Sequence, residues 1–197
     1  MSEKKKDQPE RVREQPMTYD AYAQMPDDGN RYEIFDGVLE LMSGPSIPHQ
    51  VINTKLLLLI TQSCDSDYIV LVAPLDVILS QTNVLQPDLI MVHRNRMDII
   101  TKRGIEGPPD LIVEVLSPSS HKRDKVRKMQ IYARHDVPEY WVIDPAARTL
   151  EQYALADGRY TLGNVFEDDE RIDSDKLPCV SFVINELFAD ELLRRLQ

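Results

Sequence analysis

Cysteine, glycine and long apolar runs are scarce in this chain of 197 residues, which holds two cysteines and seven glycines. Cys64 and Cys179 suggest neither a disulfide framework nor a zinc motif, and we therefore expect a reducing cytoplasm. The longest aliphatic run, Leu56 to Ile60, is far too short to cross a bilayer, so no membrane partner is expected. The charged N-terminus lacks the apolar segment of a secretory signal.

Positively charged residues are also fewer than negatively charged ones. The chain has 23 Lys and Arg and 33 Asp and Glu, so its formal net charge is −10. This balance excludes a protein whose whole surface is electropositive for nucleic acid, although it is compatible with a local basic patch. The sequence also lacks a GxxxxGKS/T loop, a GxGxxG fingerprint, a GxSxG elbow and an HExxH motif. The enzyme classes that depend on these motifs are therefore unsupported.

Apolar residues make up 42 % of the chain, which is enough to build the core of one ordinary domain. Residues 1–16 mix charges of both signs and are expected to form a disordered tail before a single domain over residues 17–197. Asp36-Gly37 and Asp157-Gly158 predict an N-terminal and a C-terminal β-hairpin. Apolar patterns predict helices over 18–25, 49–64, 123–134 and 185–196, and strands over 68–79, 87–92, 111–117, 139–145 and 179–184. This mixture predicts an α/β fold, a mixed sheet flanked by helices with the two hairpins added.

Two carboxylates stand inside otherwise apolar strand segments. Asp88 opens the strand in QPDLIMV, and Glu114 lies in LIVEVLS, where a strand would place it on one face with Ile112 and Leu116. A buried ionised carboxylate loses several kcal/mol of solvation unless a cation, hydrogen bonds or a raised pKa offsets the loss. Carboxylates on neighbouring strands can bind a hard divalent cation such as Mg²⁺, which can activate water. Taken singly, each residue is more often structural, as a turn residue or a member of an ion-pair network.

Basic residues concentrate between Lys122 and Arg134, where six Lys or Arg accompany a single acid, Asp124. On a helical wheel the core face is expected to consist of Val126, Met129 and Ala133. An adjoining arc holds Lys125, Lys128 and Tyr132.

The functional interpretation of this helix is a basic wall beside a metal site, suited to phosphate. Lys122 and Lys125 would contact nucleic acid, and Lys128 could reach back under the sheet edge because its long side chain flanks the buried face. The alternative is a solvated helix face, which we favour for Arg127 and Arg134.

A combination of four segments gives the most specific signal. The segments are RYEIFDGVLELMSGPSIPHQ, QPDLIMV, PPDLIVEVLSPSS and RDKVRKMQIYARHDVPEYWVIDP, within a span of about residues 17–190. Together they resemble the Uma-type family of restriction-endonuclease-like proteins, which is similar to the PD-(D/E)XK nuclease superfamily. The resemblance implies a core of one helix, three strands, a helix and a strand, the order that the apolar patterns predict from residue 49 onward.

The resemblance also assigns site residues. Asp88 matches the Asp of the PD motif, and Glu114 matches the acidic residue of the third strand. The lysine that the superfamily places two residues later is replaced by Leu116. The Uma-type pattern instead has a lysine on the following helix, four residues before a Tyr, which corresponds to Lys128 and Tyr132.

Three further candidates follow from the resemblance. Glu33, in RYEIFDG, matches an acidic residue that would join the site, although it could equally be a cross-strand pair partner. His49 matches as well, but a lone His at a helix start is more often structural, so His49 and Tyr132 are second-rank candidates. Apart from the resemblance, our own hypothesis adds the backbone carbonyl of Val115 as a third metal ligand beside Asp88 and Glu114.

The sequence therefore predicts a Mg²⁺-dependent endonuclease acting on nucleic acid, with DNA favoured and Mn²⁺ a candidate substitute. Asp88 and Glu114 would hold the metal, with help from Glu33, and Lys128 would orient the attacking water. The displaced lysine keeps open a catalytically inactive nucleic-acid-binding or scaffold domain of the same fold. The acidic charge keeps open a metal-dependent hydrolase of a small phosphorylated ligand. The hairpin edges are compatible with a homodimer.

Overall fold

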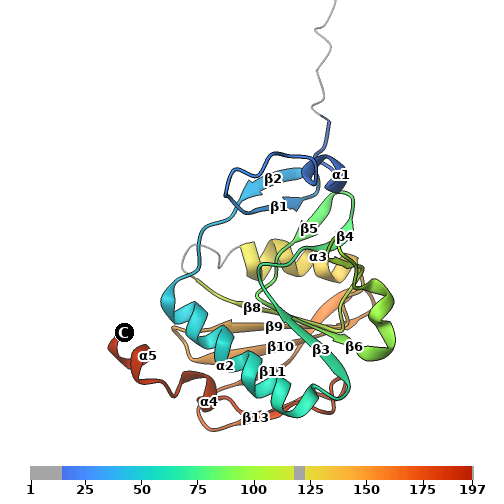
Figure 1. Ribbon diagram of the computed structural model, residues 1–197. Helices are drawn as coiled ribbons and strands as arrows, with labels where there is room; N and C mark the ends of the chain where they lie inside the picture. Colours follow the sequence, from blue (N-terminus) through green and yellow to red (C-terminus); the bar gives the residue numbers. More distant parts are fainter. Residues whose placement is uncertain (1–14, 118–122, 197) are drawn as a thin grey trace, which may run out of the picture.

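The computed structural model describes residues 15–117 and 123–196, and a six-stranded sheet lies at its centre (Figure 1). The strand order is β11-β10-β9-β8-β6-β3, in which β8 and β9 are parallel and the other neighbours antiparallel. The strands are β3 (Tyr68–Val72), β6 (Leu89–His93), β8 (Leu111–Val115), β9 (Glu139–Asp144), β10 (Thr149–Ala156) and β11 (Arg159–Phe166). This mixed sheet with flanking helices confirms the predicted fold class.

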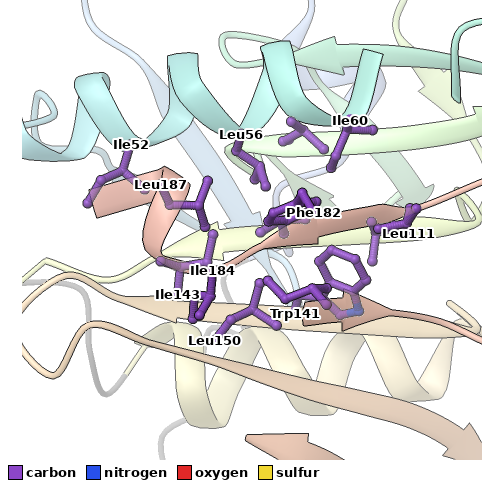
Figure 2. Packing of buried hydrophobic residues seen from close by; sticks show 14 of the residues in the cluster. Ile52, Leu56, Ile60, Leu111, Trp141, Ile143, Leu150, Phe182, Ile184 and Leu187 are labelled. Atoms are coloured by element: carbon purple, nitrogen blue, oxygen red, sulfur yellow. The ribbon is translucent and has the colours of Figure 1, made fainter. Parts of the chain in front are cut away.

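Both faces of this sheet are covered by apolar side chains. On one face, α2 (Ile47–Cys64) packs Ile52, Leu56 and Ile60 against the sheet and the C-terminal segment (Figure 2). On the other face, α3 (Met129–Arg134) packs Ile131 and Tyr132 into a second apolar cluster. Every residue of β8 is buried as a result, which explains its nearly continuous apolar sequence.

The order helix, three strands, helix, strand is confirmed as α2, β3, β6, β8, α3 and β9. Local sequence fixes where α2 begins, because the Ser46 side chain accepts a hydrogen bond from the backbone N–H of His49 at 3.4 Å. Pro48 occupies the first turn, where no intrahelical N–H is needed. The helix start therefore holds His49 at the end of α2 nearest the strand carboxylates.

The N-terminal hairpin is confirmed, but it belongs to a second sheet rather than standing alone. That sheet has the order β2-β1-β5-β4-β7. Its strands are β1 (Tyr32–Phe35), β2 (Val38–Leu41), β4 (Val77–Ser80), β5 (Asn83–Leu85) and β7 (Ile105–Glu106). The turn between β1 and β2 uses positive φ angles at Asp36 and Gly37, of 49° and 81°.

The single strand expected over 68–79 is wrong, because two strands occupy this segment. β3 pairs with β6 in the central sheet, whereas β4 pairs with β5 and β7 in the second sheet. Pro74 lies between them, and a proline has no N–H to donate to a strand partner. The chain therefore changes sheets within an apolar run that looks continuous.

The helix expected over 123–134 is present, but its predicted core face is wrong at one position. Its first part, η2 (Arg123–Lys128), is a π-helix that continues into α3. The i→i+5 bonding of a π-helix puts more residues into each turn and shifts the inward face. Val126 is consequently 45 % exposed, whereas Asp124 and Lys128 are buried.

The remaining elements follow the sequence closely. Thr18 caps α1 (Tyr19–Tyr22), and β10 with β11 forms the predicted C-terminal hairpin. The strand expected over 179–184 is β13 (Ser181–Val183), paired with β12 (Arg171–Asp173). The helix expected over 185–196 is broken at Ala189 into α4 (Asn185–Phe188) and α5 (Glu191–Arg195). The other short helix is η1 (Arg94–Ile99).

Two further expectations concern the N-terminal tail and helices that could cross a membrane. Residues 1–14, most of the predicted tail, lie outside the described residues. Among the helices of residues 15–117 and 123–196, none combines the length and apolar character that a bilayer crossing requires.

The interpretation that the two cysteines do not suggest a disulfide framework is wrong. Cys64, at the end of α2, forms a disulfide with Cys179, and their Cα atoms lie 5.1 Å apart. The two residues are 115 positions apart, so only the packing of the C-terminal segment on α2 brings them together. The bond closes a long loop around the central sheet.

Removing this cross-link should destabilise the fold. We expect Cys64→Ser with Cys179→Ser to lower the free energy of unfolding by about 2–4 kcal/mol, because the unfolded chain regains loop entropy. Urea unfolding of the variant and of the wild type, with and without reductant, measures this change. Identical midpoints for oxidised and reduced wild type would contradict the expectation.

Candidate active site

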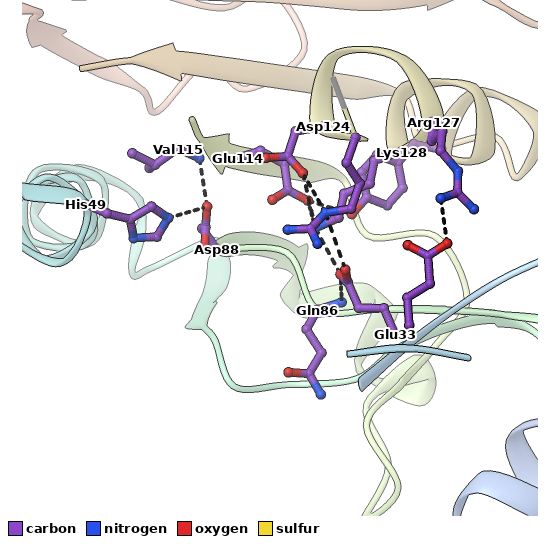
Figure 3. Close-up of polar contacts among 12 residues, drawn as sticks. Glu33, His49, Gln86, Asp88, Glu114, Val115, Asp124, Arg127 and Lys128 are labelled. Carbon is purple, nitrogen blue, oxygen red and sulfur yellow. Dashed lines mark hydrogen bonds and ion pairs between the residues drawn. The ribbon is translucent and has the colours of Figure 1, made fainter. Parts of the chain in front are cut away.

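The two strand carboxylates lie at the edge of a common pocket. Asp88 directly precedes β6, and Glu114 lies in the neighbouring strand β8 (Figure 3). Both residues, together with Val115, line a pocket of ≈ 120 Å³ between the start of α2, the strand ends and η2. The predicted juxtaposition of the two carboxylates therefore exists in the fold.

Asp88 is held by two donors on one oxygen. Its Oδ2 accepts a hydrogen bond from the backbone N–H of Val115 at 2.7 Å and contacts His49 Nε2 at 3.0 Å. The Asn53 amide also donates to the backbone carbonyl of Asp88, at 3.1 Å. These contacts fix the carboxylate, and no described residue uses its second oxygen, Oδ1.

Val115 connects the two strands at this point. In a strand the N–H and the C=O of one residue point to the same side. Because the Val115 N–H points to Asp88, its carbonyl also points to that side, beyond the end of β6. The carbonyl predicted as a metal ligand therefore lies on the Asp88 side of β8.

Glu114 lies on the opposite face of β8 from Val115, towards α3. Its Oε1 accepts hydrogen bonds from Lys128 Nζ at 2.9 Å and from the Tyr132 hydroxyl at 2.8 Å. Glu114 is 2 % exposed, and no described residue bonds its Oε2. The helix thus supplies both the lysine and the tyrosine that the resemblance points to.

The lysine that reaches Glu114 comes from a helix, as the resemblance implies, and not from the strand. Leu116, two residues after Glu114, lies in the apolar cluster beneath α3. The Lys128 ammonium instead arrives from η2, is 2 % exposed, and contacts both Glu114 and Glu33 at 2.9 Å. A lysine on a different element therefore reaches the acidic residue of the third strand.

Glu33 joins this group rather than pairing across its hairpin. Its register partner on β2 is Glu40, which has the same charge and contacts Arg127 instead. Glu33 is 1 % exposed, and its Oε1 accepts a hydrogen bond from the Gln86 N–H at 2.8 Å. Its Oε2 is buried without a hydrogen-bond partner. The second sheet therefore contributes a carboxylate to the same cluster.

Sequence reasoning missed Asp124 and Arg123. The Asp124 Oδ1 lies 3.8 Å from Lys128 Nζ and 3.6 Å from Arg123 Nε, and it is buried without a hydrogen bond. The available signal was the presence of one acid in an otherwise basic helix, four residues before Lys128. The buried group around Lys128 then contains three acids, Glu33, Glu114 and Asp124, and two bases, Arg123 and Lys128.

Burial and charge shift the titration of this cluster in definite directions. Burial raises the pKa of Glu114 well above its ordinary value, although Lys128 opposes the shift. Burial alone would lower the pKa of Lys128, but the surrounding carboxylates outweigh it and raise that pKa. Burial and the Glu114 charge likewise raise the pKa of Tyr132. Lys128 is therefore a permanent cation at neutral pH.

The other predicted contacts lie further from the pocket. Lys125 forms an ion pair with Glu151 at 2.7 Å. Arg134, for which a solvated helix face was favoured, pairs with Asp36 at 2.8 Å, so the basic helix is largely neutralised by acids. Lys122 lies outside the described residues. Arg31, which was not predicted, lines the pocket and forms no ion pair with any described residue.

The donor set fits a hard divalent cation. Asp88 Oδ1, Glu114 Oε2 and the Val115 carbonyl are oxygens of the kind that Mg²⁺ prefers, and Mg²⁺ usually takes only one or two carboxylates and keeps several waters. Within the described ranges, no three His, Cys, Asp or Glu side chains already form a metal-binding group. The chain would therefore supply some of the ligands of such an ion, and water and substrate would supply the others.

Comparisons with known proteins agree with this fold. A structure described as a putative nuclease belonging to DUF820 from Anabaena variabilis matches with a TM-score of 0.74. At 18 % identity, over 88 % of this chain and 98 % of that one, it shows a shared fold. A comparison with curated proteins finds no match. The model of the Uma2 family, described as "Putative restriction endonuclease", matches residues 19–185, and the chain therefore belongs to this nuclease family.

Proposed function

We propose that this protein is a Mg²⁺-dependent endonuclease that hydrolyses phosphodiester bonds of DNA. The observation that carries the proposal is the pocket in which Asp88 and Glu114 each keep one oxygen unbonded by any described residue, beside the buried ammonium of Lys128. A bound Mg²⁺ ion would supply positive charge for the phosphoryl group and activate water for in-line attack. Asp88, Glu114 and the Val115 carbonyl are the residues that would hold it.

Lys128 has an electrostatic role in this proposal. Its raised pKa keeps it protonated, so it cannot accept the proton of the attacking water. A fixed ammonium beside Glu114 can instead orient that water and stabilise the negative charge that develops on the phosphoryl oxygens. Glu33 and Asp124 hold the ammonium in place from the other side.

Two buried carboxylate oxygens without a hydrogen bond argue against a purely structural cluster. A buried carboxylate oxygen without a hydrogen bond costs stability, and both Glu33 Oε2 and Asp124 Oδ1 are in that condition. An inactive scaffold could replace such groups with apolar residues at no loss. A site that binds a cation has a reason to keep them.

Substrate class is tested by incubating the wild type with supercoiled plasmid, linear single-stranded DNA, RNA and a small phosphodiester, in Mg²⁺, Mn²⁺ or EDTA. We expect cleavage of DNA with either metal and none in EDTA. Cleavage of the small phosphodiester alone would favour the hydrolase of a small phosphorylated ligand. Metal-independent cleavage would contradict the proposal.

Arg31 is expected to bind a substrate phosphate, since it is the pocket cation that lacks a carboxylate partner among the described residues. Arg31→Gln should weaken DNA binding about equally for all sequences and lower the slope of log affinity against log salt by about one. Fluorescence anisotropy over a salt series measures both quantities. Lys102→Gln, at an exposed position outside the pocket, is the matched control. Equal slopes for Arg31→Gln and wild type would exclude this role.

A further inference from the structure

We propose that β11 is the interface of a homodimer in which two copies of this strand pair antiparallel and join the central sheets. β11 is the outer strand of the six-stranded sheet and pairs only with β10 within the described chain. An open strand edge is a template for another strand. The argument for a second copy rests on three features of this edge.

The first feature is the absence of charge and proline from most of the strand. Edge strands usually carry charges or proline, which discourage pairing. The segment from Tyr160 to Phe166 contains neither, in a chain whose net charge is −10. Leu162 and Val165 are instead 48 % and 41 % exposed. The edge therefore presents apolar side chains where a guarded edge would present lysine.

The second feature is the register that a β-bulge creates. Leu162 pairs with Tyr153 and Val165 pairs with Glu151, and Gly163 is the extra residue between these pairs. Because Tyr153 and Glu151 are two positions apart on β10, Leu162 and Val165 lie on the same face of the sheet. Without the bulge, residues three positions apart in a strand would face opposite sides.

This placement makes the strand complementary to itself. When the two-fold axis passes between Gly163 and Asn164, Leu162 of each copy faces Val165 of the other, on one face. Four exposed apolar side chains then form a single cluster. A shift by one residue would put side chains of opposite faces against each other, so that register is excluded.

The third feature is charge complementarity at the two ends of the strand. Arg159 begins β11, while Glu167 and Asp168 follow its end, and all three are exposed. In residues 15–117 and 123–196 none of these side chains forms an ion pair. The same antiparallel register brings Arg159 of one copy beside Glu167 and Asp168 of the other, twice in the dimer. A shift by two residues would set Arg159 against Phe166 in one direction, and in the other it would set Leu162 against the charged Glu167.

Reciprocal charge variants test this register. Wild type should change from monomer to dimer over a hundredfold range of concentration in sedimentation velocity. Leu162→Lys and Val165→Glu should each remain monomeric, since a charge then faces an apolar partner on both sides of the axis. Mixing the two variants should restore a heterodimer, in which one Lys–Glu pair and one Leu–Val pair form. Circular dichroism of each variant confirms that it is folded.

Val38→Lys is the matched control, because Val38 is 56 % exposed on β2, the outer strand of the other sheet. It should dimerise like the wild type. A wild type that stays monomeric at all concentrations would overturn the proposal. Dimers of Leu162→Lys as strong as those of the wild type, or a mixture that stays monomeric, would overturn the interface and its register.

Discussion

Replacing Lys128 with methionine is expected to lower the free energy of unfolding by about 3–5 kcal/mol at neutral pH. The Lys128 ammonium is 2 % exposed and lies 2.9 Å from carboxylate oxygens of both Glu33 and Glu114. Methionine has a similar shape but leaves those buried carboxylates without their cation. Urea unfolding of Lys128→Met and wild type, under identical ionic conditions, gives the difference directly.

The pH dependence of this loss identifies its cause. Burial raises the pKa of Glu114, and removing the Lys128 charge takes away the influence that opposes this shift. At pH values between the ordinary and the raised pKa, the native variant binds a proton that its unfolded chain has released. Its stability therefore increases as the pH falls through this window, and the gap to wild type should narrow.

Two controls separate electrostatics from packing. Lys55→Met removes a half-exposed lysine that lies 3.4 Å from Asp190, and it should change stability by less than about 1 kcal/mol. Lys128→Met combined with Glu114→Gln should recover part of the loss, because the pair is coupled. A loss for Lys128→Met that is independent of pH would indicate that packing, rather than charge, explains the effect.

Asp88→Asn is expected to reduce Mg²⁺-dependent cleavage of plasmid DNA by at least about a hundredfold. Asparagine can still accept the Val115 N–H with its amide oxygen, so the local structure should persist. The substitution removes the negative charge of the carboxylate. It also replaces one carboxylate oxygen, so the free oxygen Oδ1, which no described residue bonds, is no longer available to a metal ion. Initial rates of plasmid nicking at saturating Mg²⁺, with circular dichroism as the folding check, measure the effect.

Glu114→Gln should act in the same way, since Glu114 lines the same pocket and no described residue bonds its Oε2. Asp98→Asn is the matched control, because Asp98 is exposed on η1 and does not line the pocket. Asp98→Asn should cleave at the wild-type rate. If Asp88→Asn and Glu114→Gln retained that rate too, the nuclease activity would have to reside elsewhere.

Much of the central fold could be predicted from local sequence. β6 and β8 are apolar on both faces, and a carboxylate within such a strand is conspicuous in the amino-acid sequence itself. The helical wheel already singled out Lys128, and the resemblance to the family added Glu33, which no spacing rule would have joined to Glu114. The fold brings both of them to the same buried cluster.

The features that could not be predicted from the sequence depend on long-range packing and on irregular backbone. Asp124 turns inward because η2 is a π-helix, and a wheel drawn with regular α-helical spacing instead turned Val126 inward. The division of residues 68–79 between two sheets depends on partners elsewhere in the chain. The Cys64–Cys179 bond likewise requires the C-terminal segment to reach α2. Asp124, the single acid of a basic helix, and Pro74, between β3 and β4, are weak local signals of the first two arrangements, and the disulfide has none.

Calorimetric titration with Mg²⁺ and Mn²⁺ tests most directly whether Asp88 and Glu114 form a cation site. The wild type should bind a divalent ion, and Asp88→Asn and Glu114→Gln should each lose measurable binding while Asp98→Asn retains it. This pattern would separate a metal-dependent nuclease from an inactive scaffold of the same fold. A wild type that binds neither ion, or an Asp88→Asn protein that binds as tightly as the wild type, would contradict the proposed site.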